Sequence, residues 1–221
     1  MIIKNLTRKS GTGQLLSYLF RYITAEVKTT TKPFIVRHNI RSNSIPGYVQ
    51  EFEQNERNRK VKRKDQTCIN HTIISWSNKD AKHLNDNTLR NLAKAYIRFR
   101  GELNLYVITK HVDKEHTHLH CCVSATEMGT GKSSRISKLE FEGLKKSLDA
   151  YQKEHYPELA NSLPHHGKKR QNMLDAWKKV DRELEELDSI RKGNNKESER
   201  DFVRSLDIFE SELEGLNAFH R

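Results

Sequence analysis

The chain has 221 residues, of which 34% are hydrophobic and 31% are charged. This length suits one domain with a smaller appendage, and the clear periodicity of the apolar residues excludes a disordered chain. The 40 Lys and Arg residues exceed the 29 Asp and Glu residues, which gives a formal charge of +11. A polyanion, with nucleic acid as the first choice, is therefore the expected partner.

The positive charge is unevenly distributed along the chain. Residues 168–221 contain 12 basic and 13 acidic side chains, whereas residues 1–167 contain 28 basic and 16 acidic ones. The polyanion-binding surface is therefore expected in residues 1–167, as one domain. Opposite charges are closely paired over 171–192 and 197–217, which predicts a charged helical extension, 168–221, built as a hairpin or coiled-coil arm.

The cysteines and the apolar runs indicate the cellular compartment of the protein. Cys68, Cys121 and Cys122 are too few for a disulfide framework or a cysteine-rich zinc site. The start of the chain lacks an apolar signal core, and the longest apolar stretch, Leu15 to Phe20, is too short to span a membrane. We expect a cytoplasmic protein without a membrane segment.

Apolar periodicity predicts the elements of residues 1–167. A short strand opens at Ile2 and Ile3 and gives way to a flexible basic turn that begins at Arg8 and Lys9. Helices are predicted over about 14–26, 46–59, 86–98 and 138–155, and strands over 33–40, 69–77, 103–111 and 117–125. The last two strands are predicted to form a hairpin around Asp113-Lys114-Glu115.

Histidines cluster around this predicted hairpin. Four of the eleven lie within ten positions: His111, His116, His118 and His120. Alternate side chains of a strand share a face, so the last three point the same way, and His111 can join them from the neighbouring strand. Three converging imidazoles predict a metal site with open coordination positions. Spacing alone does not select three of the four, and Asp113 and Glu115 either orient the imidazoles or are turn residues.

Three motifs resemble those of the mobilisation relaxases of plasmids and integrative elements, the MobA/VirD2-like nuclease domains of the HUH endonuclease superfamily. The histidine motif is matched position by position, at His111, Asp113, His116, His118 and His120. The segment from Gly13 to Arg21 resembles the motif of the nucleophilic tyrosine, and His71 to Ser75 resembles the second motif. The resemblance covers roughly residues 1–160. Ser124 stands where the family has Asn, which leaves substrate contact or hairpin packing open at that position.

The resemblance implies an α/β (α+β) fold, with a central antiparallel sheet of about five strands and helices on one face. The metal site would lie on the opposite, DNA-facing side. It implies His111, His118 and His120 as ligands of a divalent metal, Mg²⁺ or Mn²⁺ with Zn²⁺ as the alternative. The residues near the metal would be His116, Asp113, Glu115 and His71. The implied partners are single-stranded or supercoiled DNA at a transfer origin, accessory mobilisation proteins and a type IV coupling protein.

Two tyrosines compete for the role of nucleophile. On the predicted helix, Tyr22 sits beside Leu15 and Leu19 and is expected to pack, whereas Tyr18 falls toward the polar side and occupies the motif position. The resemblance implies attack by Tyr18 on DNA to form a 5′-phosphotyrosyl link, which starts conjugative mobilisation. The alternatives are a rolling-circle replication initiator or transposase that uses Tyr151, and a non-catalytic, metal-containing DNA-binding accessory protein.

Basic residues either hold the sugar-phosphate backbone or form a solvated surface. The candidates are Arg8, Lys9, Arg57, Arg59, Lys60, Lys62, Arg63 and Lys64. Trp76 stacks on a base or, as is commoner for a lone tryptophan, lies in the core. The segment Gly129 to Ser133 resembles a nucleotide-binding phosphate loop, but Thr126 occupies the place of its first glycine, so we do not assign that function.

Overall fold

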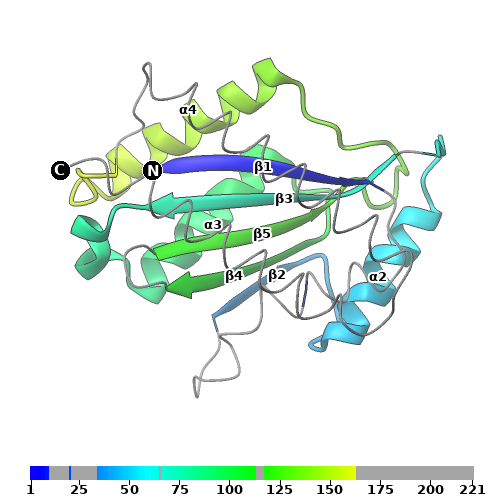
Figure 1. Ribbon diagram of the computed structural model, residues 1–221, viewed down its shortest axis with the longest axis horizontal. Coiled ribbons are helices and arrows are strands. Elements are labelled where there is room, and N and C mark those ends of the chain that lie inside the picture. Colours follow the sequence, from blue (N-terminus) through cyan, green and yellow to red (C-terminus); the bar gives the residue numbers. More distant parts are fainter. Residues whose placement is uncertain (10–19, 21–33, 65, 113–116, 163–221) are drawn as a thin grey trace, which may run out of the picture. The chain divides into compact units, whose positions relative to one another are not determined.

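The protein forms a five-stranded antiparallel sheet in a computed structural model that describes residues 1–9, 20, 34–64, 66–112 and 117–162 (Figure 1). The strand order is β1-β3-β5-β4-β2, and every neighbouring pair is antiparallel. This confirms the predicted sheet. The strands are β1 (Ile2–Lys9), β2 (Ile35–His38), β3 (Thr67–Trp76), β4 (Tyr106–Val112) and β5 (Thr117–Ser124).

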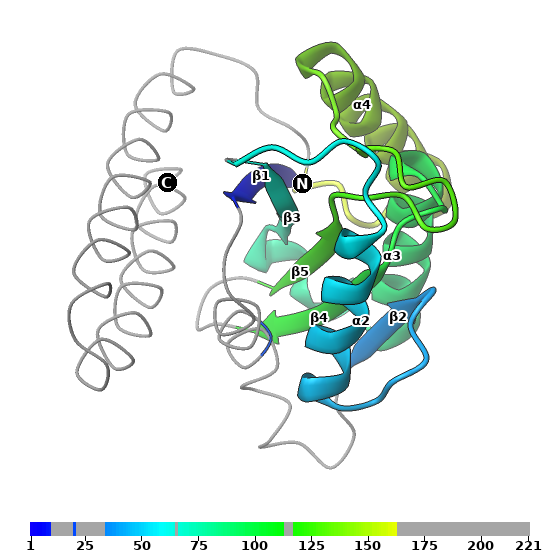
Figure 2. The ribbon, with the colours of Figure 1, turned by 90° about the vertical axis from the view of Figure 1, so that its right-hand side faces the viewer.

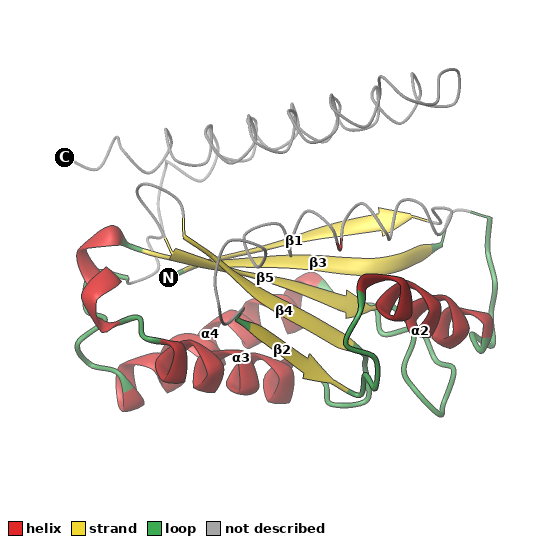
Figure 3. Ribbon diagram, turned by 90° about the horizontal axis from the view of Figure 1, so that it is seen from below, coloured by secondary structure: helices red, strands yellow, loops and turns green. Residues whose placement is uncertain are grey.

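Helices α3 (Asp86–Arg100) and α4 (Lys138–His155) cover one face of the sheet (Figure 3). Both begin at a capping residue. Asn85 accepts a hydrogen bond from the Thr88 amide, and Ser137 and Glu140 form a reciprocal capping box. Gly101, at φ 128°, ends α3 in a conformation that favours glycine. The sequence predicts both helices closely because these signals are local.

Helix α2 (Ile45–Arg57) lies at the end of the sheet where β3 begins (Figures 1 and 2). Ser44 caps its first turn by accepting a hydrogen bond from the Gly47 amide. The buried side chains of Tyr48 and Phe52 meet the Phe20 ring edge to face, at 5.7 and 5.2 Å between centroids.

The core lies between the sheet and the helices α3 and α4. The apolar face of α3 packs against alternate residues of β3 and β5, including Ile74 and Leu119. Trp76 is buried in this core, and its indole nitrogen donates to Gln152 Oε1 at 2.8 Å. The core interpretation of Trp76 therefore holds, because the ring lies against the helices.

Three local predictions are corrected. Arg8 and Lys9 belong to β1 and pair with Ile69 and Thr67, because the β3 ladder continues past the apolar residues of the strand. Strand β4 begins at Tyr106 rather than at residue 103. A short 3-10 helix, η2 (Asn78–His83), follows β3 and was not predicted.

The compact unit that contains the sheet spans Met1–Pro164. Only residue 20 of the predicted helix over 14–26 is described, and the predicted extension, 168–221, falls outside the described part of the chain. The proposed boundary between 167 and 168 therefore stays a prediction.

Candidate metal centre

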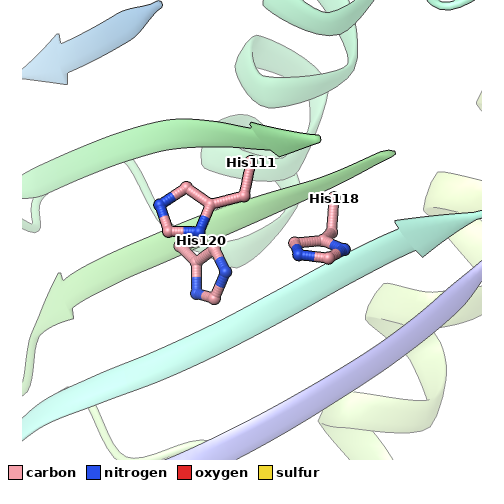
Figure 4. Close-up of side chains that lie close together, drawn as sticks. All are labelled: His111, His118 and His120. Atoms are coloured by element: carbon pink, nitrogen blue, oxygen red, sulfur yellow. The ribbon is translucent and has the colours of Figure 1, made fainter. Parts of the chain in front are cut away.

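Three of the clustered histidines meet on the sheet face opposite α3 and α4, which we call the site face. His111 of β4 is paired directly with His118 of β5, and His120 follows two residues later on the same face. Their imidazoles are drawn together in Figure 4. The hairpin is therefore the element that builds the cluster.

The three imidazoles are close enough to share one ion. Each offers one ligand nitrogen, and these nitrogens all lie within 4.8 Å of one another. The His111 and His120 ring centroids are 4.3 Å apart, and those of His118 and His120 are 5.3 Å apart. All three side chains are buried. This donor set fits a divalent ion that keeps positions for water or substrate.

His71 joins the cluster from the neighbouring strand β3. Its Nε2 lies 2.9 Å from Nδ1 of His120, and the two rings are stacked at 5.1 Å between centroids. If His120 donates its Nδ1 proton to His71, the other nitrogen of His120 keeps its lone pair for a metal. His71 therefore contacts a candidate ligand, and its place near a metal stays a prediction.

The surroundings of His120 favour its neutral form. Burial lowers its pKa well below the usual 6.5, and the nearby His111, His71 and His118 lower this pKa further. A metal binds the unprotonated imidazole, so the neutral state is the one that a ligand requires.

Lys4 also lies on the site face, and sequence reasoning missed it. It pairs with Ile73 of β3, which pairs with His120, so Lys4 and His120 occupy one row across the sheet. Burial lowers the pKa of Lys4 from 10.5 to about 6. The signal available in the sequence was the alternation of β1, which sends Ile3 to the core and Lys4 to the other face.

Several predicted site residues fall outside the described part of the chain. These are Tyr18, Tyr22, Asp113, Glu115 and His116. The backbones of Arg8 and Lys9 are described as part of β1, whereas their side chains are not. Their roles stay predictions.

Arg59 corrects the predicted DNA-binding set. It is only 7% exposed and forms an ion pair with Glu56 at 2.7 Å. Its guanidinium also donates to the carbonyl oxygens of Thr67 (2.7 Å) and Ala125 (3.1 Å). Arg59 therefore ties α2 to the ends of β3 and β5 and cannot contact a DNA backbone. The other candidates of this run are exposed: Arg57, Lys60, Lys62, Arg63 and Lys64.

Ser124 packs the hairpin. It is buried, and its Oγ accepts a hydrogen bond from the Leu105 amide at 3.0 Å and donates to the Thr126 carbonyl at 2.8 Å. Asn104 donates to the Ser124 carbonyl at 2.8 Å. These contacts answer the question left open by the sequence in favour of hairpin packing.

Tyr151 lies on the wrong side of the sheet to act at the histidines. It belongs to α4 and packs against the core, with its ring 6.3 Å from Phe99 and 4.3 Å from His155 between centroids. The sheet separates it from the site face. The position of Tyr151 therefore argues against a replication initiator or transposase that uses this residue as its nucleophile.

The fold and the histidine face are those of a relaxase nuclease domain. The family model described as "Relaxase: MobA/VirD2-like, nuclease domain" matches residues 22–156, which is more than half of the chain. The chain belongs to this family, as its motifs predicted. The matched segment begins at Tyr22, so Tyr18 precedes it.

Solved structures show the same fold. The chain is similar to the MobM relaxase domain bound to a 26-nucleotide pMV158 oriT DNA, with 18% identity and a TM-score of 0.51, covering 76% of this chain and 97% of that one. A Mn-bound structure of MobM with oriT DNA at pH 5.5 gives 19% identity and a TM-score of 0.52, covering 76% and 91%. A structure on vancomycin resistance transfer in Staphylococcus aureus gives 12% identity and a TM-score of 0.51, covering 73% and 95%.

The comparison with curated proteins finds no match. Among the described helices, none is long and apolar enough to cross a membrane.

Proposed function

We propose that this relaxase domain nicks and rejoins one strand of DNA at a transfer origin, through a covalent link to Tyr18 formed beside the histidine centre. The observation that carries the proposal is the group of three buried histidines on the site face, whose ligand nitrogens lie within 4.8 Å of one another. Family membership supplies the nuclease activity. The MobM relaxase domain, to which the chain is similar, is bound to oriT DNA.

His111, His118 and His120 are proposed to hold one divalent ion, Mg²⁺ or Mn²⁺, with Zn²⁺ as the alternative. A bound ion would neutralise charge on the scissile phosphate and favour the phenolate form of a nearby tyrosine. His71 would act as a positioning residue, because its contact with His120 Nδ1 fixes the orientation of that ring. His116, Asp113 and Glu115 are proposed to complete the surroundings of the ligands.

Tyr18 is the proposed nucleophile, with Tyr22 as the second choice. A phenol has a pKa of roughly 10, so it must lose its proton before attack at neutral pH. The phenolate oxygen would form a bond to phosphorus while the bond from phosphorus to the 3′ oxygen breaks. The 3′ oxygen takes up a proton, and the 5′ end stays on the tyrosine. The reverse reaction rejoins the strand without an external energy source.

The exposed basic residues Arg57, Lys60, Lys62, Arg63 and Lys64 are proposed to hold the sugar-phosphate backbone, together with Arg8 and Lys9 of β1. Such contacts carry no sequence information and weaken with salt. Accessory mobilisation proteins and a type IV coupling protein are the proposed protein partners. The predicted extension, 168–221, is the proposed place for dimerisation or for docking a component of the transfer machinery.

A covalent adduct on DNA tests the proposal. A supercoiled plasmid that carries the native flanking DNA is incubated with the protein and Mg²⁺ or Mn²⁺, or with chelator, and then denatured. We expect an adduct that needs the metal, survives in Tyr151→Phe and is lost in Tyr18→Phe and in His118→Ala. Tyr151→Phe is the matched control because its ring lies on the opposite face.

Two results would contradict the proposal. An adduct that is lost in Tyr22→Phe but kept in Tyr18→Phe would move the nucleophile to Tyr22. Metal binding and tight DNA binding without any adduct would instead assign a non-catalytic accessory role.

A further inference from the structure

Residues 126–135, which we call the glycine hairpin, form a tight turn and its return segment after β5. Thr126 and Ser133 are bridged, and the Glu127 amide donates to the Lys132 carbonyl at 2.9 Å. Gly129 and Gly131 adopt φ angles of 76° and 66°, which favour glycine. This is the segment whose sequence resembles a phosphate loop, and its backbone is a closed hairpin instead.

The glycine hairpin is hydrogen-bonded to residues 58–64, which we call the basic loop. The Lys60 amide donates to the Gly131 carbonyl at 2.9 Å. The two backbones approach so closely that a Cβ on Gly131 would lie 2.4 Å from the Asn58 carbonyl oxygen. The Asn55 side chain also donates to the Thr126 carbonyl at 2.7 Å. Only glycine fits at position 131, so the two loops are held together as one surface.

This shared surface is strongly basic. Among the nearby acids, Glu56 pairs with Arg59, whereas Glu127 accepts a hydrogen bond from Thr130 at 2.8 Å and keeps its charge. Asp65 stands next to the basic loop in the sequence. We call the six exposed cations the two-loop surface: Lys60, Lys62, Arg63, Lys64, Lys132 and Arg135.

The two-loop surface adjoins the end of the sheet that leads to the histidines. The basic loop precedes β3, and the glycine hairpin follows β5. Ser124 at the end of β5 lies about 13 Å along the strand from His120, at about 3.3 Å per residue. A DNA strand that leaves the histidine centre toward this end of the sheet can therefore reach both loops.

We propose that the two-loop surface binds the backbone of the DNA strand beyond the histidine centre, and that the glycine hairpin contributes Lys132 and Arg135 to this binding. The inference rests on the proposed DNA substrate and extends the contact surface to a loop outside the basic run. It assigns these two residues to affinity and to the salt dependence of binding.

The salt dependence of binding tests the role of the two cations. A labelled single-stranded oligonucleotide of the native flanking sequence is titrated by fluorescence anisotropy at several salt concentrations, with chelator present so that no strand is cut. Each phosphate contact on single-stranded DNA contributes about 0.7 to the slope of log K against log salt. The double variant K132Q/R135Q should therefore lower the magnitude of that slope by about 1.4.

A matched double variant on α3, outside the two-loop surface, provides the control. Lys94 and Arg98 are exposed on α3, which lies on the helix side of the sheet (Figure 3). K94Q/R98Q removes the same charge and should leave the slope unchanged. An unchanged slope in K132Q/R135Q, or an equal decrease in K94Q/R98Q, would overturn the inference while leaving the proposed nuclease function intact. Failure of the wild-type chain to bind DNA would overturn both.

A pair of glycine variants tests the contact between the two loops without changing the charge of the protein. Gly131→Ala places a Cβ against the Asn58 carbonyl, whereas Gly129→Ala meets nothing within 4 Å, although both positions have positive φ. We expect Gly131→Ala to weaken oligonucleotide binding more than Gly129→Ala does. Thermal unfolding of both variants separates displacement of the loop from loss of the fold. Equal oligonucleotide binding by two folded variants would show that the contact between the two loops does not contribute to DNA affinity.

Discussion

Arg57, Arg59 and Lys60 stand almost side by side in one basic run, yet only Arg59 is buried. The difference arises because Glu56 and two backbone carbonyls surround the Arg59 guanidinium. Glu56 also accepts hydrogen bonds from Gln66 at 2.7 Å and from Thr126 at 2.6 Å. The pair therefore joins three segments of chain.

Removing Arg59 should destabilise the fold. Arg59→Met leaves Glu56 without its cationic partner and should lower the free energy of unfolding by about 3 kcal/mol, as expected when one member of a buried pair is lost. Lys60→Met, at the exposed neighbouring position, should change it by less than about 0.5 kcal/mol. Urea denaturation of both variants measures the difference. Similar values for the two would show that the buried network contributes little.

Strand β1, at the edge of the sheet, directs its alternate side chains to the two faces. Its alternation buries Ile3 among the core residues and directs Lys4 to the site face. Burial lowers the pKa of Lys4 to about 6. An amine with this pKa is largely neutral at pH 7 in the folded protein, whereas it is protonated in the unfolded chain.

This difference in protonation predicts a pH-dependent stability. Between the folded pKa of about 6 and the unfolded value of 10.5, the unfolded chain binds more protons, so the contribution of Lys4 to stability rises with pH over that window. Lys4→Met should therefore raise the free energy of unfolding at pH 7 by at least about 1 kcal/mol and flatten its rise toward pH 10. Lys94→Met is the exposed control. A destabilised Lys4→Met protein would contradict the expectation.

At the scale of the whole molecule, the sheet separates two kinds of chemistry. The face toward α3 and α4 is the apolar core, and the opposite face presents the histidines and Lys4. The core can therefore stabilise the hairpin without involving its imidazoles. A metal that binds only the folded arrangement should add to the stability of the domain.

Metal binding should accordingly raise the melting temperature. An ion at 100 times its Kd adds about 2.7 kcal/mol to the free energy of unfolding. We expect Mn²⁺ to raise Tm in the wild type and in His155→Ala, whose imidazole is exposed on α4, but not in His118→Ala. Differential scanning fluorimetry with and without chelator measures the shift. An equal shift in His118→Ala would place the ion elsewhere.

Much of the fold could be predicted from the sequence because its signals are local. The bounds of α4 were predicted closely, since its apolar periodicity is a local signal of neighbouring residues. The first strand was predicted too short, because pairing with β3 continues through polar residues that carry no apolar signal. The hairpin began later than predicted, because Asn104 and Leu105 are engaged with Ser124.

The sequence by itself determined that histidines spaced by two on a strand would share a face, because strand alternation is a property of the backbone. It also determined the family, through motifs that resemble those of the relaxases. Only the tertiary structure decided that His71 would meet His120, that Arg59 would be buried by Glu56, and that Tyr151 would lie behind the sheet. These outcomes depend on which distant segments pack together, and no local pattern of residues carries that information.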